Sequence, residues 1–202
     1  MLKRRLVPVL ALILCLGLAG MARAGAPTDQ LKGTIDKIIA VLKEPALKGE
    51  SQRLERRNKI FNIVEERFDF PEMAKRSVGE YWQKLSEAEQ KEFELAFANL
   101  LQNSYISKIE KYSDETVNFS NEKSKGDEYF SVHTDIVSGG KAIPVDYSLH
   151  EAGGQWLVYD VNIEGVSLVT NYRSQFTETI RKDGFKGLMD KINDKLKKLN
   201  ES

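Results

Sequence analysis

Few side chains in the sequence could bind a metal ion or act as a catalytic base. The 202 residues contain two histidines, His133 and His150, and one cysteine, Cys15. His133 lies in a segment that alternates like a strand and His150 lies beside a turn. Neither has a second ligand at the spacing of a metal site. We therefore expect both histidines to be structural, and we expect no metal and no cofactor.

Two acidic residues lie in segments with the alternation of strands, where carboxylates are uncommon. A buried acid inside a sheet covered by helices could transfer protons. However, Asp146 lies between Val145 and Tyr147, so it faces away from these apolar neighbours, and the same parity holds for Asp160. We expect both carboxylates to make surface ion pairs or structural hydrogen bonds.

Three short patterns resemble catalytic or phosphate-binding motifs. Ser167 follows Gly165 but lacks the second glycine of a nucleophile elbow, and it is better placed to cap the helix after it. Residues 120–123 have Ser-Lys spacing but lie in a polar loop. The paired glycines at 139–140 and 153–154 are typical of hairpin turns rather than phosphate loops. The sequence therefore offers no credible catalytic group.

Helical spacing of apolar residues precedes and follows the middle of the chain. It predicts helices over 28–43, 53–68 and 71–77, and a helical C-terminal part after Gly165 that breaks at Gly184. The longest helix starts at Ser86, where Ser86 and Glu89 fit a capping box, and runs for about 26 residues to Tyr112. Its apolar face is rich in aromatic residues and wider than one sheet contact needs, which is a hint of a lined space.

The period changes from 3.6 to 2 after the long helix. Strands are predicted at 117–119, 130–136, 143–149 and 157–163. The short turns between them indicate an antiparallel meander, so the expected fold is α+β, with helices over a four-stranded sheet and five strands as the alternative. Strict alternation places Leu157, Tyr159, Val161 and Ile163 on one face, and Trp156 with Val158 on the other.

The N-terminus has the pattern of a cleaved signal peptide over residues 1–24. Basic residues precede an apolar run of about fifteen residues, shorter than the roughly 20 of a bilayer-spanning helix, and Ala22-Arg23-Ala24 fits a cleavage site. An uncleaved anchor is the alternative. Leu14 before Cys15 argues against a lipoprotein. Residues 25–202 would then form one domain.

Cleavage at that site would change the charge and the cysteine content. It removes four basic residues and no acidic one, so the mature chain would have 26 basic and 30 acidic residues, a formal charge of −4. This balance gives no indication of nucleic acid binding. Cys15 would also leave, which excludes thiol chemistry and disulfides.

Basic residues cluster in two predicted helices. A solvated helix face is the ordinary interpretation, because acidic residues are mixed into both clusters. Contact with an anionic lipid head group or an acidic partner is the alternative. The clusters are Arg53, Arg56, Arg57 and Lys59, and Lys191, Lys195, Lys197 and Lys198.

Two spaced stretches resemble the MlaC family of periplasmic phospholipid-binding proteins, also called the toluene-tolerance or Tol-Tol family. The resemblance covers nearly all of the mature chain. The more specific stretch contains Trp156, Tyr159-Asp160, Glu164-Gly165-Val166-Ser167, Thr170 and Gly187-Leu188. The other contains Phe68-Asp69-Phe70-Pro71, Met73-Ala74, Gly79, Tyr81-Trp82, Ser86, Gln90 and Phe93.

The resemblance implies a soluble, non-enzymatic carrier in the periplasm that shields the acyl chains of a phospholipid in an apolar cavity. Its implied partners are an inner-membrane ABC transporter with an MlaD-like ring and an outer-membrane MlaA-like lipoprotein with a porin. The implied role is to maintain the lipid asymmetry of the outer membrane. We expect a monomer.

We expect the cavity to be lined by apolar side chains from the long helix, the sheet and the C-terminal helices, although each could equally be ordinary core. The candidates are Phe97, Leu101, Tyr105, Phe130, Val132, Val145, Tyr147, Tyr159, Val161, Val166, Val169 and Phe176. Three alternatives stay open: a carrier of another apolar lipid such as a hopanoid, a small isomerase-like enzyme, and an interaction module whose own side chains fill the interior.

Overall fold

The computed structural model describes residues 26–111 and 115–201. The predicted signal peptide and Tyr112 lie outside the described residues. The helices are α1 (Ala26–Lys43), α2 (Arg53–Glu65), α3 (Phe70–Val78), α4 (Glu87–Ile109) and α5 (Leu168–Asn200), with short 3-10 helices η1 (Pro45–Leu47), η2 (Glu50–Gln52) and η3 (Gly79–Lys84). The strands are β1 (Thr116–Ser124), β2 (Tyr129–Ser138), β3 (Lys141–Ala152), β4 (Gln155–Ile163) and β5 (Val166–Ser167).

Side-chain caps fix the starts of the central helices. Asp69 accepts a hydrogen bond from the backbone N–H of Glu72 at 2.9 Å and so caps α3. At α4 the capping box is confirmed, because the Ser86 N–H donates to Glu89 Oε2 at 2.8 Å and the Glu89 N–H donates to Ser86 Oγ at 3.3 Å. Among the described residues, no helix has the length and apolar character needed to cross a bilayer.

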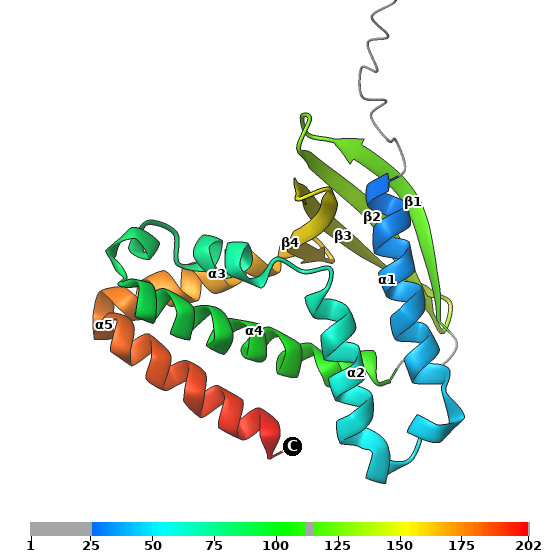
Figure 1. Cartoon of the computed structure of the whole chain (residues 1–202), viewed down its shortest axis with the longest axis horizontal. Helices are drawn as coiled ribbons and strands as arrows, with labels where there is room; N and C mark the ends of the chain where they lie inside the picture. The colour runs from blue at the N-terminus through cyan, green and yellow to red at the C-terminus, as the bar shows by residue number, and fades with distance from the viewer. Residues whose placement is uncertain (1–25, 112–114, 202) are drawn as a thin grey trace, which may run out of the picture.

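The sheet is an antiparallel meander in the order β1-β2-β3-β4-β5, which confirms the predicted α+β class with five strands. Its central register pairs Tyr147 of β3 with Val132 of β2 and with Val161 of β4. β1 is longer than the predicted 117–119. Figure 1 shows α1 lying across the sheet, and helices α3, α4 and α5 forming a separate layer beside it.

A β-bulge in β4 makes the predicted alternation of this strand wrong. Ser148 pairs with Asp160, whereas the next residue, Leu149, pairs with Val158, so Tyr159 is the extra residue. Because of this extra residue, the β4 side chains that precede Tyr159 face the side opposite to the one that strict alternation predicts. Val158 therefore lies on the same face as Val161, in place of Tyr159.

Two groups of apolar side chains form the core. The sheet cluster joins Leu31 of α1 to one face of the sheet: Val132, Val145, Leu149, Val158 and Val161 are buried in it. The helical cluster lies between α3, α4 and α5 and includes Phe70, Met73, Val78, Trp82, Phe93, Phe97, Leu100, Leu101, Val169, Phe176, Leu188, Met189 and Ile192. Phe68, between α2 and α3, packs against both clusters.

The segment around Phe68 ties the two clusters together. The Val158 N–H donates to the Arg67 carbonyl at 2.8 Å, and the Asp69 N–H donates to the Val158 carbonyl at 2.9 Å. The Arg67 guanidinium donates to the Trp156 carbonyl at 2.6 Å, and burial lowers its pKa from the usual value. This short junction therefore fixes the helical layer to the sheet through backbone hydrogen bonds.

The last helix bends back on itself at Gly184. This residue has φ 71° and ψ 179°, a backbone conformation that residues other than glycine rarely adopt. The predicted break at Gly184 is thereby confirmed. Phe185 and Leu188, after the bend, pack into the same helical cluster as Phe176 before it.

Candidate functional site

Both histidines are paired with carboxylates on the sheet. His133 Nδ1 lies 2.7 Å from Asp146 Oδ1, on neighbouring strands. His150 Nε2 lies 2.8 Å from Asp69 Oδ2, which links β3 to the cap of α3. In the part of the chain that the structure describes, no group of three His, Cys, Asp or Glu side chains could hold a metal ion. These contacts explain both histidines as structural residues.

Asp160 has a structural role as well. Its Oδ2 accepts a hydrogen bond from the Ser167 hydroxyl at 2.6 Å, and its Oδ1 accepts one from the Val169 N–H at 3.1 Å. Ser167 Oγ in turn accepts from the Thr170 N–H at 3.0 Å, so the predicted helix cap is confirmed. These polar groups of the β4–α5 junction cap the N-terminus of α5.

The sheet presents an apolar wall with Tyr147 in its middle. β2 and β4 flank Tyr147 on both sides. Burial raises the pKa of its phenol to about 12. Tyr147 is nevertheless only half-buried, so part of this apolar wall is accessible.

The helical layer presents a second apolar wall, built mainly from aromatic rings. The Phe97 ring contacts the rings of Tyr172 and Phe176, with centroid distances of 5.3 and 5.6 Å. Tyr105 packs against the same cluster, and burial together with the nearby Tyr172 raises the pKa of its phenol. The rings meet edge to face, which is a favoured geometry for aromatic pairs.

The predicted lining residues divide between these walls. Five belong to or pack on the helical cluster: Phe97, Leu101, Tyr105, Val169 and Phe176. Four belong to or pack on the sheet cluster: Val132, Val145, Tyr147 and Val161. Phe130 contacts the Trp156 ring at 4.8 Å, and Val166, in β5, is 55% exposed.

Tyr159 lies apart from the other candidates. The bulge turns it to the opposite face of the sheet, where its ring contacts Tyr129 at 5.8 Å and His150 at 5.7 Å. The Arg76 guanidinium lies over it at 4.2 Å. The expectation that Tyr159 and Val161 share one wall is therefore wrong.

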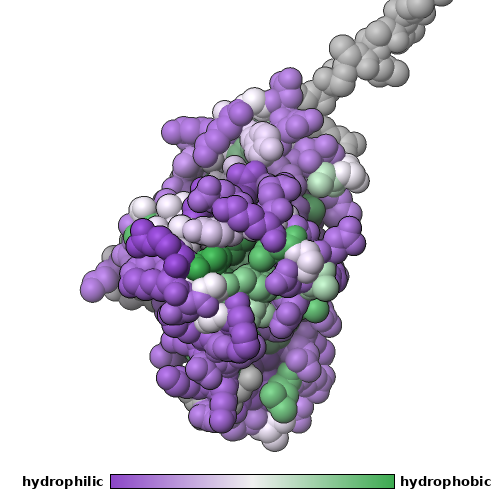
Figure 2. All heavy atoms as spheres, turned by 90° about the vertical axis from the view of Figure 1, so that its left-hand side faces the viewer, coloured by the Kyte–Doolittle hydropathy of each residue, from purple (hydrophilic) through white to green (hydrophobic). Residues whose placement is uncertain are grey.

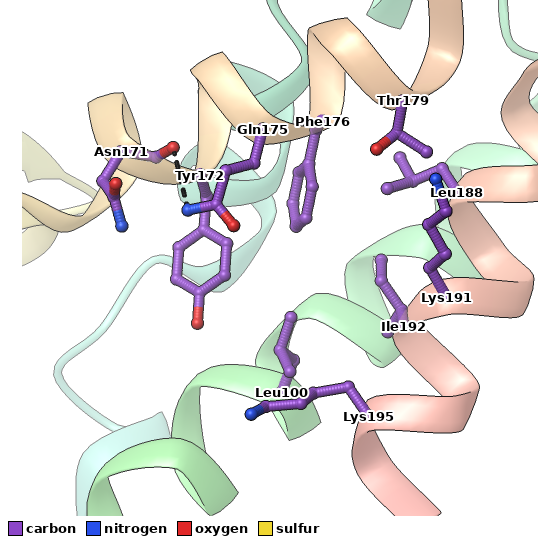
Figure 3. Close-up of a pocket in the computed structure, with 10 residues that line it drawn as sticks. All are labelled: Leu100, Asn171, Tyr172, Gln175, Phe176, Thr179, Leu188, Lys191, Ile192 and Lys195. Atoms are coloured by element: carbon purple, nitrogen blue, oxygen red, sulfur yellow. Dashed lines mark hydrogen bonds between the residues drawn. The ribbon is translucent and has the colours of Figure 1, made fainter. Parts of the chain in front are cut away.

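A pocket of about 420 Å³ lies between α4 and the two arms of α5. Figure 3 shows side chains from all three helical segments converging on it. Phe176 is the one predicted lining residue that also lines this pocket. The others that line it are Leu100, Asn171, Tyr172, Gln175, Thr179, Leu188, Lys191, Ile192 and Lys195.

The helical cluster also reaches the surface at one end of the molecule. Its partly buried members include Tyr81 of η3, Leu85 after it, and Phe185 of α5. Figure 2 shows the end that is on the left in Figure 1, where apolar side chains gather in a central hollow and hydrophilic side chains surround them. Apolar surface is therefore accessible on the helical side as well as over the sheet.

Comparison with known protein families decides the affiliation. A family model described as the MlaC protein matches residues 32–194. The chain belongs to the MlaC family. Both stretches that resemble the family in sequence lie within this match.

Three relatives extend this result. The intermembrane phospholipid transport system binding protein MlaC of Haemophilus influenzae is 23% identical over 120 residues, which cover 57% of this chain but only 56% of that protein. Toluene tolerance protein ttg2D of Pseudomonas putida is 23% identical over 185 residues, covering 91% of this chain and 84% of that protein. A phospholipid-binding protein from Ralstonia solanacearum, solved in complex with a phospholipid, superposes with a TM-score of 0.76 at 24% identity, over 85% of this chain and 97% of that one. The last likeness establishes that the fold is shared.

In this MlaC-family chain, sequence reasoning missed most of the pocket beside α5. Its walls come from residues on both sides of Gly184, and only a bend of known direction brings them together. The available signal was the basic cluster containing Lys191 and Lys195, on a helix whose other face is apolar.

Proposed function

We propose that the chain is a soluble periplasmic carrier of phospholipid, which holds the acyl chains between the apolar wall of the sheet and the helical layer. The observation that carries the proposal is the incompletely covered apolar wall of the sheet. Tyr147 and other branched and aromatic side chains pack on this wall and are only partly buried.

The energy of lipid transfer explains why such a wall is needed. A phospholipid has roughly 30 acyl methylenes at about 0.8 kcal/mol each, so transfer from a bilayer to water costs on the order of 25 kcal/mol. A carrier lowers this cost by replacing the hydrocarbon surroundings. It must also release the lipid, so its contacts are apolar and replaceable rather than ionic.

The relatives support the same function. The Haemophilus protein is named as a binding protein of an intermembrane phospholipid transport system, and the Ralstonia protein was solved with a phospholipid. By this relationship the partners are an inner-membrane ABC transporter with an MlaD-like ring and an outer-membrane MlaA-like lipoprotein with a porin. Transfer between them would maintain the lipid asymmetry of the outer membrane.

The domain organisation follows from the same proposal. Residues 1–24 act as a cleaved signal peptide, and residues 25–202 form the lipid-binding domain in the periplasm. The hydrogen bonds of Asp146, Asp160 and both histidines hold elements of this domain together.

The test is the lipid content of the protein purified from a bacterial periplasm. Extraction and mass spectrometry of the full-length gene product should give stoichiometric phospholipid. Tyr147→Trp places a larger side chain in the middle of the apolar wall and should remove most of it. Tyr129→Trp is the matched control, because Tyr129 lies on the opposite face of the sheet and is 37% exposed. A hopanoid in place of phospholipid, or equal phospholipid in both variants, would contradict the proposal.

A further inference from the structure

We propose that the pocket between α4 and the two arms of α5 is a second binding site, which takes an anionic amphiphile with a single alkyl chain, such as a free fatty acid. None of the described residues of the sheet lines it, and the proposal does not depend on phospholipid transport. Four observations carry it: the charges at the pocket, its apolar floor, the position of the Lys195 ammonium and its volume.

The charge of the lining is one-sided. The ten lining residues include Lys191 and Lys195 and no carboxylate, in a chain with 30 basic and 30 acidic residues. Lys191 Nζ is held by Asp183 Oδ2 at 2.7 Å. Among the described residues Lys195 has no acidic partner, so its ammonium is available to a ligand. An anionic group is therefore the complementary one.

The floor of the pocket is hydrocarbon. Leu100, Phe176, Leu188 and Ile192 are between 1% and 6% exposed, so their packed side chains give an alkyl chain a dry surface. Because α4 and both arms of α5 contribute these residues, the bend at Gly184 creates the pocket. An inorganic anion would leave this floor unused.

Polar groups lie at both ends of the pocket. Figure 3 shows the Lys195 ammonium and the Tyr172 hydroxyl at one end, and the Lys191 ammonium and the Thr179 hydroxyl near Leu188 at the other. Because Asp183 pairs with Lys191, the Lys195 end is the one open to an anionic group. A carboxylate there would meet one cation and the Tyr172 hydroxyl, with its chain directed along the floor.

The volume is sufficient for an alkyl chain. The pocket measures about 420 Å³, which lies within the range of about 300 to 1,000 Å³ that is usual for small-ligand sites. A single alkyl chain can therefore lie along the floor.

The experiment is a calorimetric titration of lipid-free protein with myristate, and with tetradecanol as the uncharged analogue. Lys195→Glu should weaken myristate binding about ten-fold or more and leave tetradecanol binding nearly unchanged. Lys198→Glu is the matched control on the same helix, since Lys198 is exposed and does not line the pocket. It should have no more than a two-fold effect. Thr179→Trp, which fills the pocket, should abolish binding of both probes.

Three results would overturn the proposal. The first is an absence of myristate binding to the wild-type protein. The second is an equal loss in Lys195→Glu and Lys198→Glu, which would indicate attraction by overall charge. The third is a loss in Tyr147→Trp with full binding in a folded Thr179→Trp variant, because the chain would then bind at the sheet wall around Tyr147. If Thr179→Trp does not fold, the surface pair of lysine variants decides alone.

Discussion

The hydroxyl of Ser167 donates a 2.6 Å hydrogen bond to the carboxylate of Asp160, so the last long strand holds the first turn of the last helix. The same carboxylate accepts the Val169 N–H, which is one of the unpaired donors at the helix start. Asp160 therefore joins the start of α5 to β4, beside the pairing of β5 with β4.

Replacing Asp160 by alanine should destabilise the protein by about 1–3 kcal/mol, because it leaves the Ser167 hydroxyl and the Val169 N–H without their acceptor. The measurement is the midpoint of urea unfolding. Asp127→Ala, in the exposed turn between β1 and β2, is the control and should change the midpoint little. Equal midpoints for the two variants would mean that Asp160 does not hold the junction.

A partly buried ion-pair triad should make stability depend on pH. Burial acts to raise the pKa of Glu110, but hydrogen bonds and charge attraction from Arg57 and Arg56 outweigh it, so its pKa lies below the usual value. Glu110→Gln should therefore destabilise the protein by about 1–2 kcal/mol at pH 7. This cost is fully present above the unfolded-state pKa of about 4.3 and is lost as the pH falls through the lower folded-state pKa.

Unfolding of Glu110→Gln and wild type by denaturant, at pH 7 and pH 3, measures this difference. The gap between the two proteins should narrow at pH 3. Glu178, an exposed carboxylate paired with Lys182 at 2.6 Å, provides the control substitution, and Glu178→Gln should show a small gap at both pH values. A Glu110→Gln gap that widens on acidification would contradict the assigned direction.

The bulge at Tyr159 makes a prediction about lipid content. Tyr159→Ala should lower stability by about 1–2 kcal/mol through lost contacts with Arg76, Tyr129 and His150. It should leave bound phospholipid unchanged, because the side chain lies on the face opposite to Val161. Thermal unfolding and lipid extraction from one preparation check both parts. Loss of lipid from a folded Tyr159→Ala protein would place Tyr159 in the lipid site.

Gly184→Ala should lower stability by about 1–3 kcal/mol, since no alanine adopts φ 71° and ψ 179° without strain. Myristate binding should fall with it, because the two arms of α5 would no longer enclose the pocket. Gly33→Ala is an informative control: Gly33 lies inside α1 with no heavy atom near an added Cβ, so that substitution should raise stability by about 0.5–1 kcal/mol. Thermal unfolding of both variants shows whether each substitution lowers or raises the stability.

Local signals predicted the elements well because their causes are local. The capping box at Ser86, the cap at Ser167 and the break at Gly184 each depend on a few neighbouring residues. Turns that contain glycine and the short distances between successive strands in the sequence likewise predicted the antiparallel meander. The fold class followed from the order of these elements.

The sequence could not predict features that depend on long-range contacts. The bulge at Tyr159 is invisible to an alternation rule, which assumes that every residue of a strand has a partner. The contact between His150 and Asp69 joins residues 81 positions apart. To predict the pocket, one would need to know the direction of the bend at Gly184 as well as its location.

The junction at Phe68 is one of two attachments of the helical layer to the same strand. Phe68 packs on both hydrophobic clusters, and its neighbours join them through two backbone hydrogen bonds to Val158. The second attachment is Asp160, two residues further along β4, which accepts hydrogen bonds from Ser167 and from the Val169 N–H. A change of position in β4 would therefore reach both ends of the helical layer at once.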